Sequence, residues 1–217
     1  MTYPGPKAQR NESVAARSER RAFIFVAALG AMLMPAALGI ALGMSVDLRP
    51  LLKYDIADVA FGLAAVMPLA LLLRWFMKTK WRPLAEFRAS QLEFFAGIGF
   101  GLTRPRIVTL AIIAGVSEEL MFRGVLQEII DRRFGIAAAI AATSMIFGLL
   151  HARTVLYAVI ATMVGAYFSL LFLATGSLIA PIVAHAVYDF IAFEWTRIAL
   201  DRRAAISPAV QDQPPPQ

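Results

Sequence analysis

The chain contains no cysteine, which excludes thiol nucleophiles, disulfide bonds and cysteine-ligated metal sites. It contains only two histidines in 217 residues, so any reaction that needs an imidazole depends on His151 or His185. Charged residues are also scarce, at 17% of the chain against about a quarter in soluble domains. Because a soluble domain normally has more charged residues on its surface, this composition indicates a membrane protein.

Apolar residues make up 59% of the chain and are grouped in long runs. The run from Ala22 to Met44 has no charge and exceeds the roughly 20 residues that a transmembrane helix needs, and Pro35 within it predicts a kink. Further spans are expected at 59–76, 107–130, 136–151, 155–174 and 178–200. The sequence therefore predicts an all-α integral membrane protein, a bundle of about six transmembrane helices with an intramembrane polar cavity.

This pattern divides the chain into four parts. We expect a disordered basic cytoplasmic tail at 1–21, two transmembrane helices with an interfacial connector at 22–106, a four-helix core at 107–200, and a second disordered tail at 201–217.

Positive charge is distributed unevenly between the loops. The net charge of +6 comes from Lys and Arg that flank the apolar runs, so it indicates orientation in a lipid bilayer and not nucleic-acid binding. Most of the 21 Lys and Arg lie on one side if the amino terminus is inside, which predicts that both termini are cytoplasmic. The short, alanine-rich chain with its basic loops favours the inner or plasma membrane of a bacterium.

Three charged side chains interrupt the expected span at 107–130. Ionisable residues at membrane depth are costly and usually functional. Glu119 and Arg123 are four residues apart and lie on one helix face, in the favourable order of acid before base. Glu118 points away from that pair, so the sequence predicts one neutralised carboxylate and one that is free for chemistry.

The two histidines lie in other expected spans and have neighbours on their own helix faces. Asp189 follows His185 by four residues, and Phe147 precedes His151 by four, where its ring can shield or orient the imidazole. Each polar group would be unsatisfied in hydrocarbon unless they meet, so we expect Glu118, His151 and His185 to converge.

Two chemistries fit a carboxylate beside two imidazoles. The carboxylate and an imidazole can activate water, with the remaining donors stabilising an oxyanion. The set Glu118, His151 and His185 can equally hold a divalent metal such as zinc with an open position. The sequence alone does not separate these alternatives.

Three motifs occur in order on separate helices: Glu118-Glu119-Leu-Met-Phe-Arg123-Gly124, Phe147-Gly-Leu-Leu-His151 and His185-Ala-Val-Tyr-Asp189. Together they resemble the pattern of the CPBP family, which comprises CAAX prenyl protease 2 (the type II CAAX endopeptidase) and its bacterial Abi relatives. The resemblance covers about residues 107–193. It implies that Glu118 and His151 activate water, that His185 and position 189 form the oxyanion site, and that Glu119, Arg123 and Phe147 support them.

One position departs from the eukaryotic form of that pattern, which ends in His-x-x-x-Asn. Asp189 stands where that pattern has Asn, and an ionised Asp has no hydrogen to donate to an oxyanion. A protonated Asp189, an Asp189 that binds a metal and an Asp189 that orients His185 are the alternatives.

The function expected from the resemblance is an intramembrane endopeptidase of glutamate or metal-dependent type. Its partner would be a membrane-associated peptide or protein, either of CAAX type or a bacteriocin or peptide precursor. A non-catalytic immunity or scaffold protein of the same fold is one alternative. The other is a proton-coupled transporter that uses the same carboxylates and imidazoles as a relay. Neither the substrate nor the oligomeric state follows from the sequence.

Overall fold

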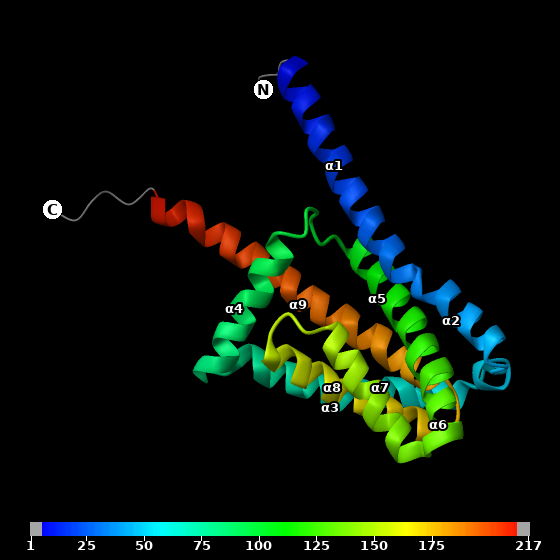
Figure 1. Cartoon of the computed structure of the whole chain (residues 1–217). Coiled ribbons are helices and arrows are strands. Elements are labelled where there is room, and N and C mark those ends of the chain that lie inside the picture. Colours follow the sequence, from blue (N-terminus) through cyan, green and yellow to red (C-terminus); the bar gives the residue numbers. More distant parts are fainter. Residues whose placement is uncertain (1–5, 212–217) are drawn as a thin grey trace.

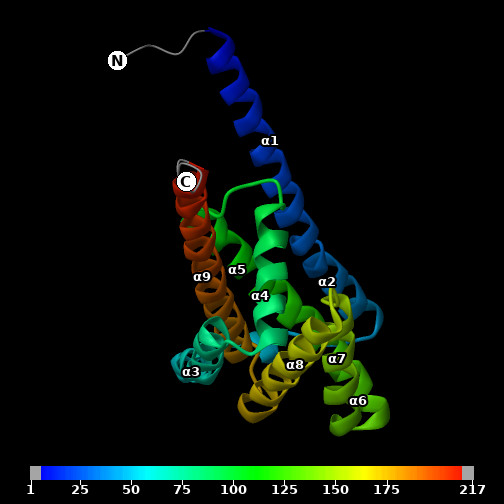
Figure 2. The same cartoon turned by 90° about the vertical axis from the view of Figure 1, so that its left-hand side faces the viewer.

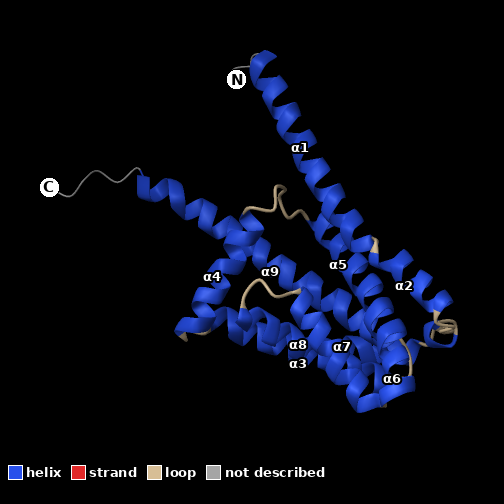
Figure 3. Cartoon of the chain, viewed as in Figure 1, coloured by secondary structure: helices blue, strands red, loops and turns tan. Residues whose placement is uncertain are grey.

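A computed structural model describes residues 6–211 of the chain, with side chains from 14 to 205. Every regular element in residues 6–211 is helical, joined by short loops (Figure 3). The described chain is therefore all-α, as the sequence predicts.

The first apolar run forms two helices, α1 (Pro6–Ala31) and α2 (Leu33–Gly43). The break between them is at Met32, directly after Ala31, the residue four before Pro35 whose carbonyl clashes with the proline ring and receives no hydrogen bond from it. The kink expected at Pro35 is thus present.

Parts of the two segments expected to be tails, 1–21 and 201–217, belong to helices. Helix α1 already begins at Pro6 and helix α9 (Ile179–Gln211) continues to Gln211, whereas residues 1–5 and 212–217 lie outside the described residues. Both extensions are rich in Ala and Arg, which are good helix formers, and extending an existing helix needs no new nucleus.

The next elements connect the first apolar helices to the charged motif. A single 3₁₀ turn, η1 (Pro50–Leu52), precedes α3 (Ile56–Lys78), whose first turn is capped by the Asp55 carboxylate through the Ala57 amide at 2.8 Å. Helix α4 (Arg82–Ala96) falls within the expected connector, and it buries three apolar side chains, Leu84, Phe87 and Leu92.

The helix with the charged motif is not a regular α-helix throughout. It consists of α5 (Arg104–Glu119), the π-helical segment η2 (Leu120–Gln127) and α6 (Glu128–Phe134). The π-helical segment begins directly after the two glutamates and contains Arg123, and such segments occur frequently at functional sites. The sequence pattern did not indicate it.

Two further helices, α7 (Ile136–Leu150) and α8 (Val155–Thr175), form a hairpin before α9. The loop between α7 and α8 contains His151, and the Thr154 side chain caps α8 through the Tyr157 amide at 3.1 Å. Gly135 and Gly176 have positive φ at the turns that flank this hairpin.

Three helical stretches within the described residues are long and apolar enough to cross a membrane: Val14–Gly43, which covers most of α1 and all of α2, Ile56–Lys78 and Val155–Thr175. The protein is therefore an integral membrane protein. The other expected spans fall on α7, which is apolar but shorter, and on α5 to α6 and α9, which carry the charged motif residues.

Helix α9 packs against α3, α5 and α8, and its carboxyl-terminal end and the start of α1 project beyond the rest of the bundle (Figures 1 and 2). Two glycines allow close helix contacts. A Cβ on Gly115 would lie 2.9 Å from the Ala186 backbone nitrogen, and one on Gly148 would lie 2.6 Å from the Ala158 carbonyl oxygen. These contacts hold α5 against α9 and α7 against α8, as small residues do between membrane helices.

Candidate active site

Three charged or titratable side chains form a hydrogen-bonded set in the interior, which we call the buried network: Glu119, Arg123 and His185. One oxygen of Glu119, Oε1, accepts from Arg123 Nη1 at 2.9 Å and lies 2.7 Å from His185 Nδ1. Arg123 also donates through Nη2 to the Gly165 carbonyl of α8 at 2.6 Å. Glu119 and Arg123 are at most 1% exposed, so this network ties α5 and η2 to α8 and α9 in the protein interior.

A second set, the open cluster, adjoins His185 on its other nitrogen and consists of Glu118, His151 and Asp189. Glu118 Oε2 lies 3.9 Å from the Nε2 atoms of both His151 and His185. Asp189 Oδ2 lies 3.6 Å from His185 Nε2. The predicted convergence of Glu118 with both imidazoles is thus present, at separations longer than direct hydrogen bonds.

The proton on the His151 ring can be placed from its partners. Nδ1 lies 2.8 Å from the Phe147 carbonyl oxygen, which only accepts, so Nδ1 carries a hydrogen. Nε2 then presents its lone pair toward Glu118 when the ring is neutral. The Phe147 ring stacks on the imidazole with centroids 4.4 Å apart, so Phe147 orients His151 by both its backbone and its ring.

His185 is the member of the buried network that also contacts the open cluster. Its Nδ1 faces Glu119, while its Nε2 faces Glu118 and Asp189. With a proton on each nitrogen, His185 is a cation between carboxylates, and Nε2–H becomes a donor in the open cluster. The Phe168 ring stacks on the imidazole at 4.9 Å.

Several contacts of the site did not follow from the sequence. The sequence assigned Glu119 to Arg123 alone, whereas the same carboxylate also bonds His185, which lies 66 residues away in the chain. Phe168 and Tyr157 of α8 were also missed, although Tyr157 lies edge-on to His151 with centroids 6.1 Å apart. Their spacing of about three helical turns places both on one face of α8, and this signal was available.

Glu118, His151 and His185 are the residues that the sequence offers to a metal. In the part of the chain that the structure describes, no group of three or more His, Asp or Glu side chains is placed to hold a metal ion. His185 Nδ1 is bonded to Glu119, and its Nε2 faces Glu118. A carboxylate beside two imidazoles can activate water.

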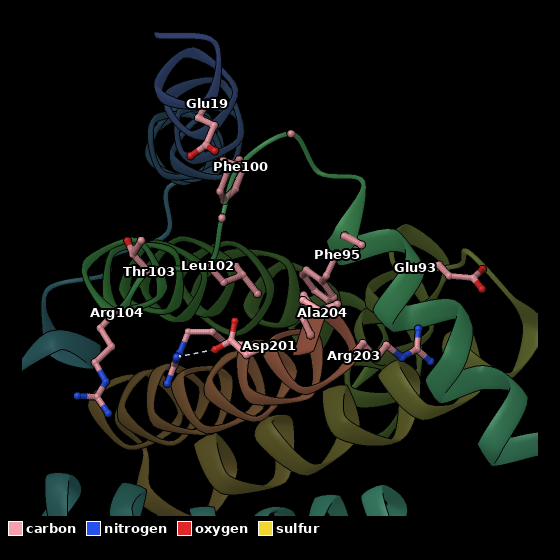
Figure 4. Close-up of a pocket in the computed structure, with 15 residues that line it drawn as sticks. Glu19, Glu93, Phe95, Phe100, Leu102, Thr103, Arg104, Asp201, Arg203 and Ala204 are labelled. Atoms are coloured by element: carbon pink, nitrogen blue, oxygen red, sulfur yellow. Dashed lines mark hydrogen bonds and ion pairs between the residues drawn. The ribbon is translucent and has the colours of Figure 1, made fainter. Parts of the chain in front are cut away.

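Two cavities lie outside the polar site. A cavity of about 1090 Å³ lies between α1, the α4–α5 loop and α9, where Phe95, Phe100 and Leu102 meet charged side chains such as the Arg197–Asp201 pair (Figure 4). It adjoins the start of α5, roughly 20 Å along that helix from Glu118. A second cavity, of about 670 Å³, is lined mainly by apolar side chains of α7 and α8 and reaches Ala152, the residue after His151.

Residues 99–191 match the family model for "Type II CAAX prenyl endopeptidase Rce1-like". That range begins in the loop before α5 and ends within α9, so it contains the buried network and the open cluster. No curated protein and no solved structure matches the chain. The chain therefore carries, over residues 99–191, a domain of the Rce1-like family of type II CAAX prenyl endopeptidases.

Proposed function

We propose that the protein is an intramembrane endopeptidase that hydrolyses a peptide bond with water activated by Glu118. Family membership implies an intramembrane protease, and this favours a peptidase over the immunity-protein and transporter alternatives. The observation that carries the proposal is the position of Glu118 Oε2, 3.9 Å from Nε2 of both histidines. A water molecule beside these atoms can bond to Glu118 and His151 together.

In this mechanism the Glu118 carboxylate takes a proton from the water as its oxygen attacks the peptide carbonyl carbon. The unprotonated Nε2 of His151 holds the water in line through its other hydrogen. The new C–O bond leaves a tetrahedral oxyanion, which accepts a hydrogen bond from Nε2–H of cationic His185. The C–N bond then breaks as Glu118 returns the proton to the leaving amine, which yields an amine and a carboxylic acid; the acid then loses its proton to solvent.

Asp189 has a different role here from an asparagine at that position. At 3.6 Å from His185 Nε2, its carboxylate stabilises the imidazolium and orients it. With Glu119 on Nδ1, the charge on His185 is balanced from both sides. The donor to the oxyanion is then His185 alone, and Asp189 acts through it.

For the arrangement in the membrane we keep the expectation from the sequence. We place six crossings in the bundle and both termini in the cytoplasm, and the ends of the described chain lie on the same side of the molecule in both views (Figures 1 and 2). The substrate is a membrane-associated peptide or protein. The apolar cavity beside the His151 loop suits an apolar segment of such a substrate.

The test is cleavage of a fluorescence-quenched farnesylated peptide with a CAAX end by the purified full-length protein in detergent. The Glu118→Gln variant keeps the side-chain shape and removes the base, so we expect at least a ~100-fold lower kcat. Glu128→Gln is the matched control, because Glu128 follows on α6 in a half-exposed pair with Arg132. Wild-type turnover in Glu118→Gln would contradict the proposal.

A further inference from the structure

Three more polar side chains are buried near Arg123 without any hydrogen-bond partner in the protein. Gln127 of η2, Ser144 of α7 and Ser169 of α8 are at most 2% exposed, and neither the Gln127 amide nor the two hydroxyls has a partner. Arg123 Nε and Glu119 Oε2 are also buried and unpaired. Buried polar groups in folded proteins are nearly all hydrogen-bonded, so this concentration of unpaired polar atoms on five side chains requires an explanation.

The contacts around Gly165 place these groups on one boundary between η2, α7 and α8. A Cβ on Gly165 would lie 3.3 Å from Ser144 Cα and 3.5 Å from Arg123 Nη2. Ser169 follows Gly165 by one turn of α8, and Gln127 follows Arg123 by about one turn of η2. The unpaired groups therefore extend the polar interior away from the open cluster, on the far side of Arg123.

The helices themselves do not satisfy these hydroxyls. Thr143, next to Ser144, donates to the Ala139 carbonyl of its own helix at 2.8 Å, but Ser144 makes no such bond. For Ser169 the equivalent acceptor is the Gly165 carbonyl, which already accepts from Arg123 at 2.6 Å. A helical serine usually donates to the carbonyl of the residue four before it. Ser144 makes no such bond, and for Ser169 that carbonyl is already bonded to Arg123.

The unpaired atoms also define what can bind them. Arg123 Nε and Gln127 Nε2 only donate, whereas Gln127 Oε1 and Glu119 Oε2 accept. A cation would be repelled by Arg123, and an anion by Glu119. Water donates and accepts, and a buried water typically makes two to four hydrogen bonds to groups of this kind.

We propose that Gln127, Ser144, Ser169 and the Nε–H of Arg123 bind a cluster of buried water molecules, which we call the water site. These waters hydrate the part of the guanidinium that bonds neither Glu119 nor Gly165. This inference is independent of the proposed peptidase reaction, because it concerns the buried network and not the open cluster.

The first test is the sign of the stability change in the Ser144→Ala/Ser169→Ala double variant. If water is bound, the variant loses hydrogen bonds, and we expect the thermal midpoint to fall by roughly 2–4 °C per hydroxyl. If the site is dry, removing two unpaired buried hydroxyls relieves a desolvation penalty and the midpoint rises. A midpoint that rises or stays unchanged overturns the proposal.

Ser117→Ala is the matched control, since Ser117 is equally buried but donates to the Ile113 carbonyl at 2.7 Å. We expect its midpoint to change by less than about 2 °C, because a back-bonded helical hydroxyl contributes little.

A second measurement uses the wild-type protein and does not depend on the variant folding. Pulsed hydroxyl-radical footprinting labels side chains that touch bound water even when they are shielded from bulk solvent. Phe122 is 3% exposed and its ring centroid lies 5.9 Å from Arg123 Cζ, so we expect it to be labelled well above Phe87, which is the same residue type and 8% exposed. Background labelling of Phe122 overturns the water site.

Discussion

The buried network and the open cluster meet at His185, but they differ in the distances between their polar atoms and in their exposure. In the buried network the polar atoms lie 2.6–2.9 Å apart, and Glu119 and Arg123 are at most 1% exposed. In the open cluster the separations are 3.6–3.9 Å, and the side chains of Glu118, His151 and Asp189 are 17–30% exposed. Two neighbouring glutamates thus occupy opposite environments.

This contrast indicates that the two groups have different roles, one structural and one chemical. Short bonds among fully buried groups fix the positions of three helices, and any reactant would have to break them. Longer separations among partly exposed groups leave room for water and substrate, and catalytic hydrogen bonds often shorten only in the complex. The buried network holds His185, and the open cluster is where we propose that the reaction occurs.

The largest effect should come from breaking the buried network at Arg123. We expect Arg123→Met to lower the free energy of unfolding by about 3–5 kcal/mol, because it leaves the buried Glu119 carboxylate without its guanidinium partner. Chemical unfolding in detergent measures this change.

Arg132→Met is the matched control for that experiment. It breaks a Glu–Arg pair of the same spacing on α6, but this pair is half-exposed and should contribute at most about 1 kcal/mol. Equal destabilisation by the two variants would show that the buried pair has no special structural role.

The next largest effect concerns Asp189 in the open cluster. Replacing it with Leu removes the carboxylate that holds His185 Nε2, and we expect kcat to fall by about 100-fold or more. Asp189→Asn keeps the shape and adds a donor toward the oxyanion, so its kcat should stay within about tenfold of wild type. A kcat for Asp189→Leu that matches wild type would remove Asp189 from the mechanism.

A smaller effect is expected where α7 meets α8, three residues before His151. Gly148→Ala would place a Cβ 2.6 Å from the Ala158 carbonyl, and we expect this overpacking to destabilise the protein by about 1–3 kcal/mol. Gly39→Ala, in a helix with no atom near the new Cβ, should be neutral or stabilising. Thermal unfolding of both variants tests this contact, and equal midpoints would contradict it.

Much of the fold could be predicted because apolar runs and helical periodicity are local properties. The Glu119–Arg123 pair follows from i to i+4 spacing, and the expected end of α8 lies within one residue of its observed end, Thr175. The π-helical segment η2 could not be predicted from this periodicity. The tails are expected from composition alone, whereas the lengths of α1 and α9 also depend on the neighbouring apolar helix, which can extend into a polar segment without a new nucleus.

The site was predictable only in part, for a related reason. His151 and His185 could be identified because the chain has only two histidines, both in expected membrane spans, where a polar group needs partners. The bond from Glu119 to His185 depends on the close contact at Gly115, a tertiary feature. Helical periodicity therefore separated the two glutamates correctly but did not reveal that both face the same histidine.

The smallest effect expected is that of chelators. Because the described Glu, Asp and His side chains form no metal-binding group, we expect strong zinc chelators to change the turnover of the purified protein by less than about twofold. Loss of activity that added zinc restores would instead support a metal-dependent reaction.

The most direct test of the division between the two glutamates measures kcat and the thermal midpoint together for Glu118→Gln and Glu119→Gln. We expect Glu118→Gln to keep the wild-type midpoint and to lose turnover, because Glu118 makes no hydrogen bond through Oε2 in the folded protein. Glu119→Gln should lose folded protein first, because it leaves Arg123 uncompensated and weakens the bond to His185. A well-folded but inactive Glu119→Gln beside an active Glu118→Gln would contradict this expectation.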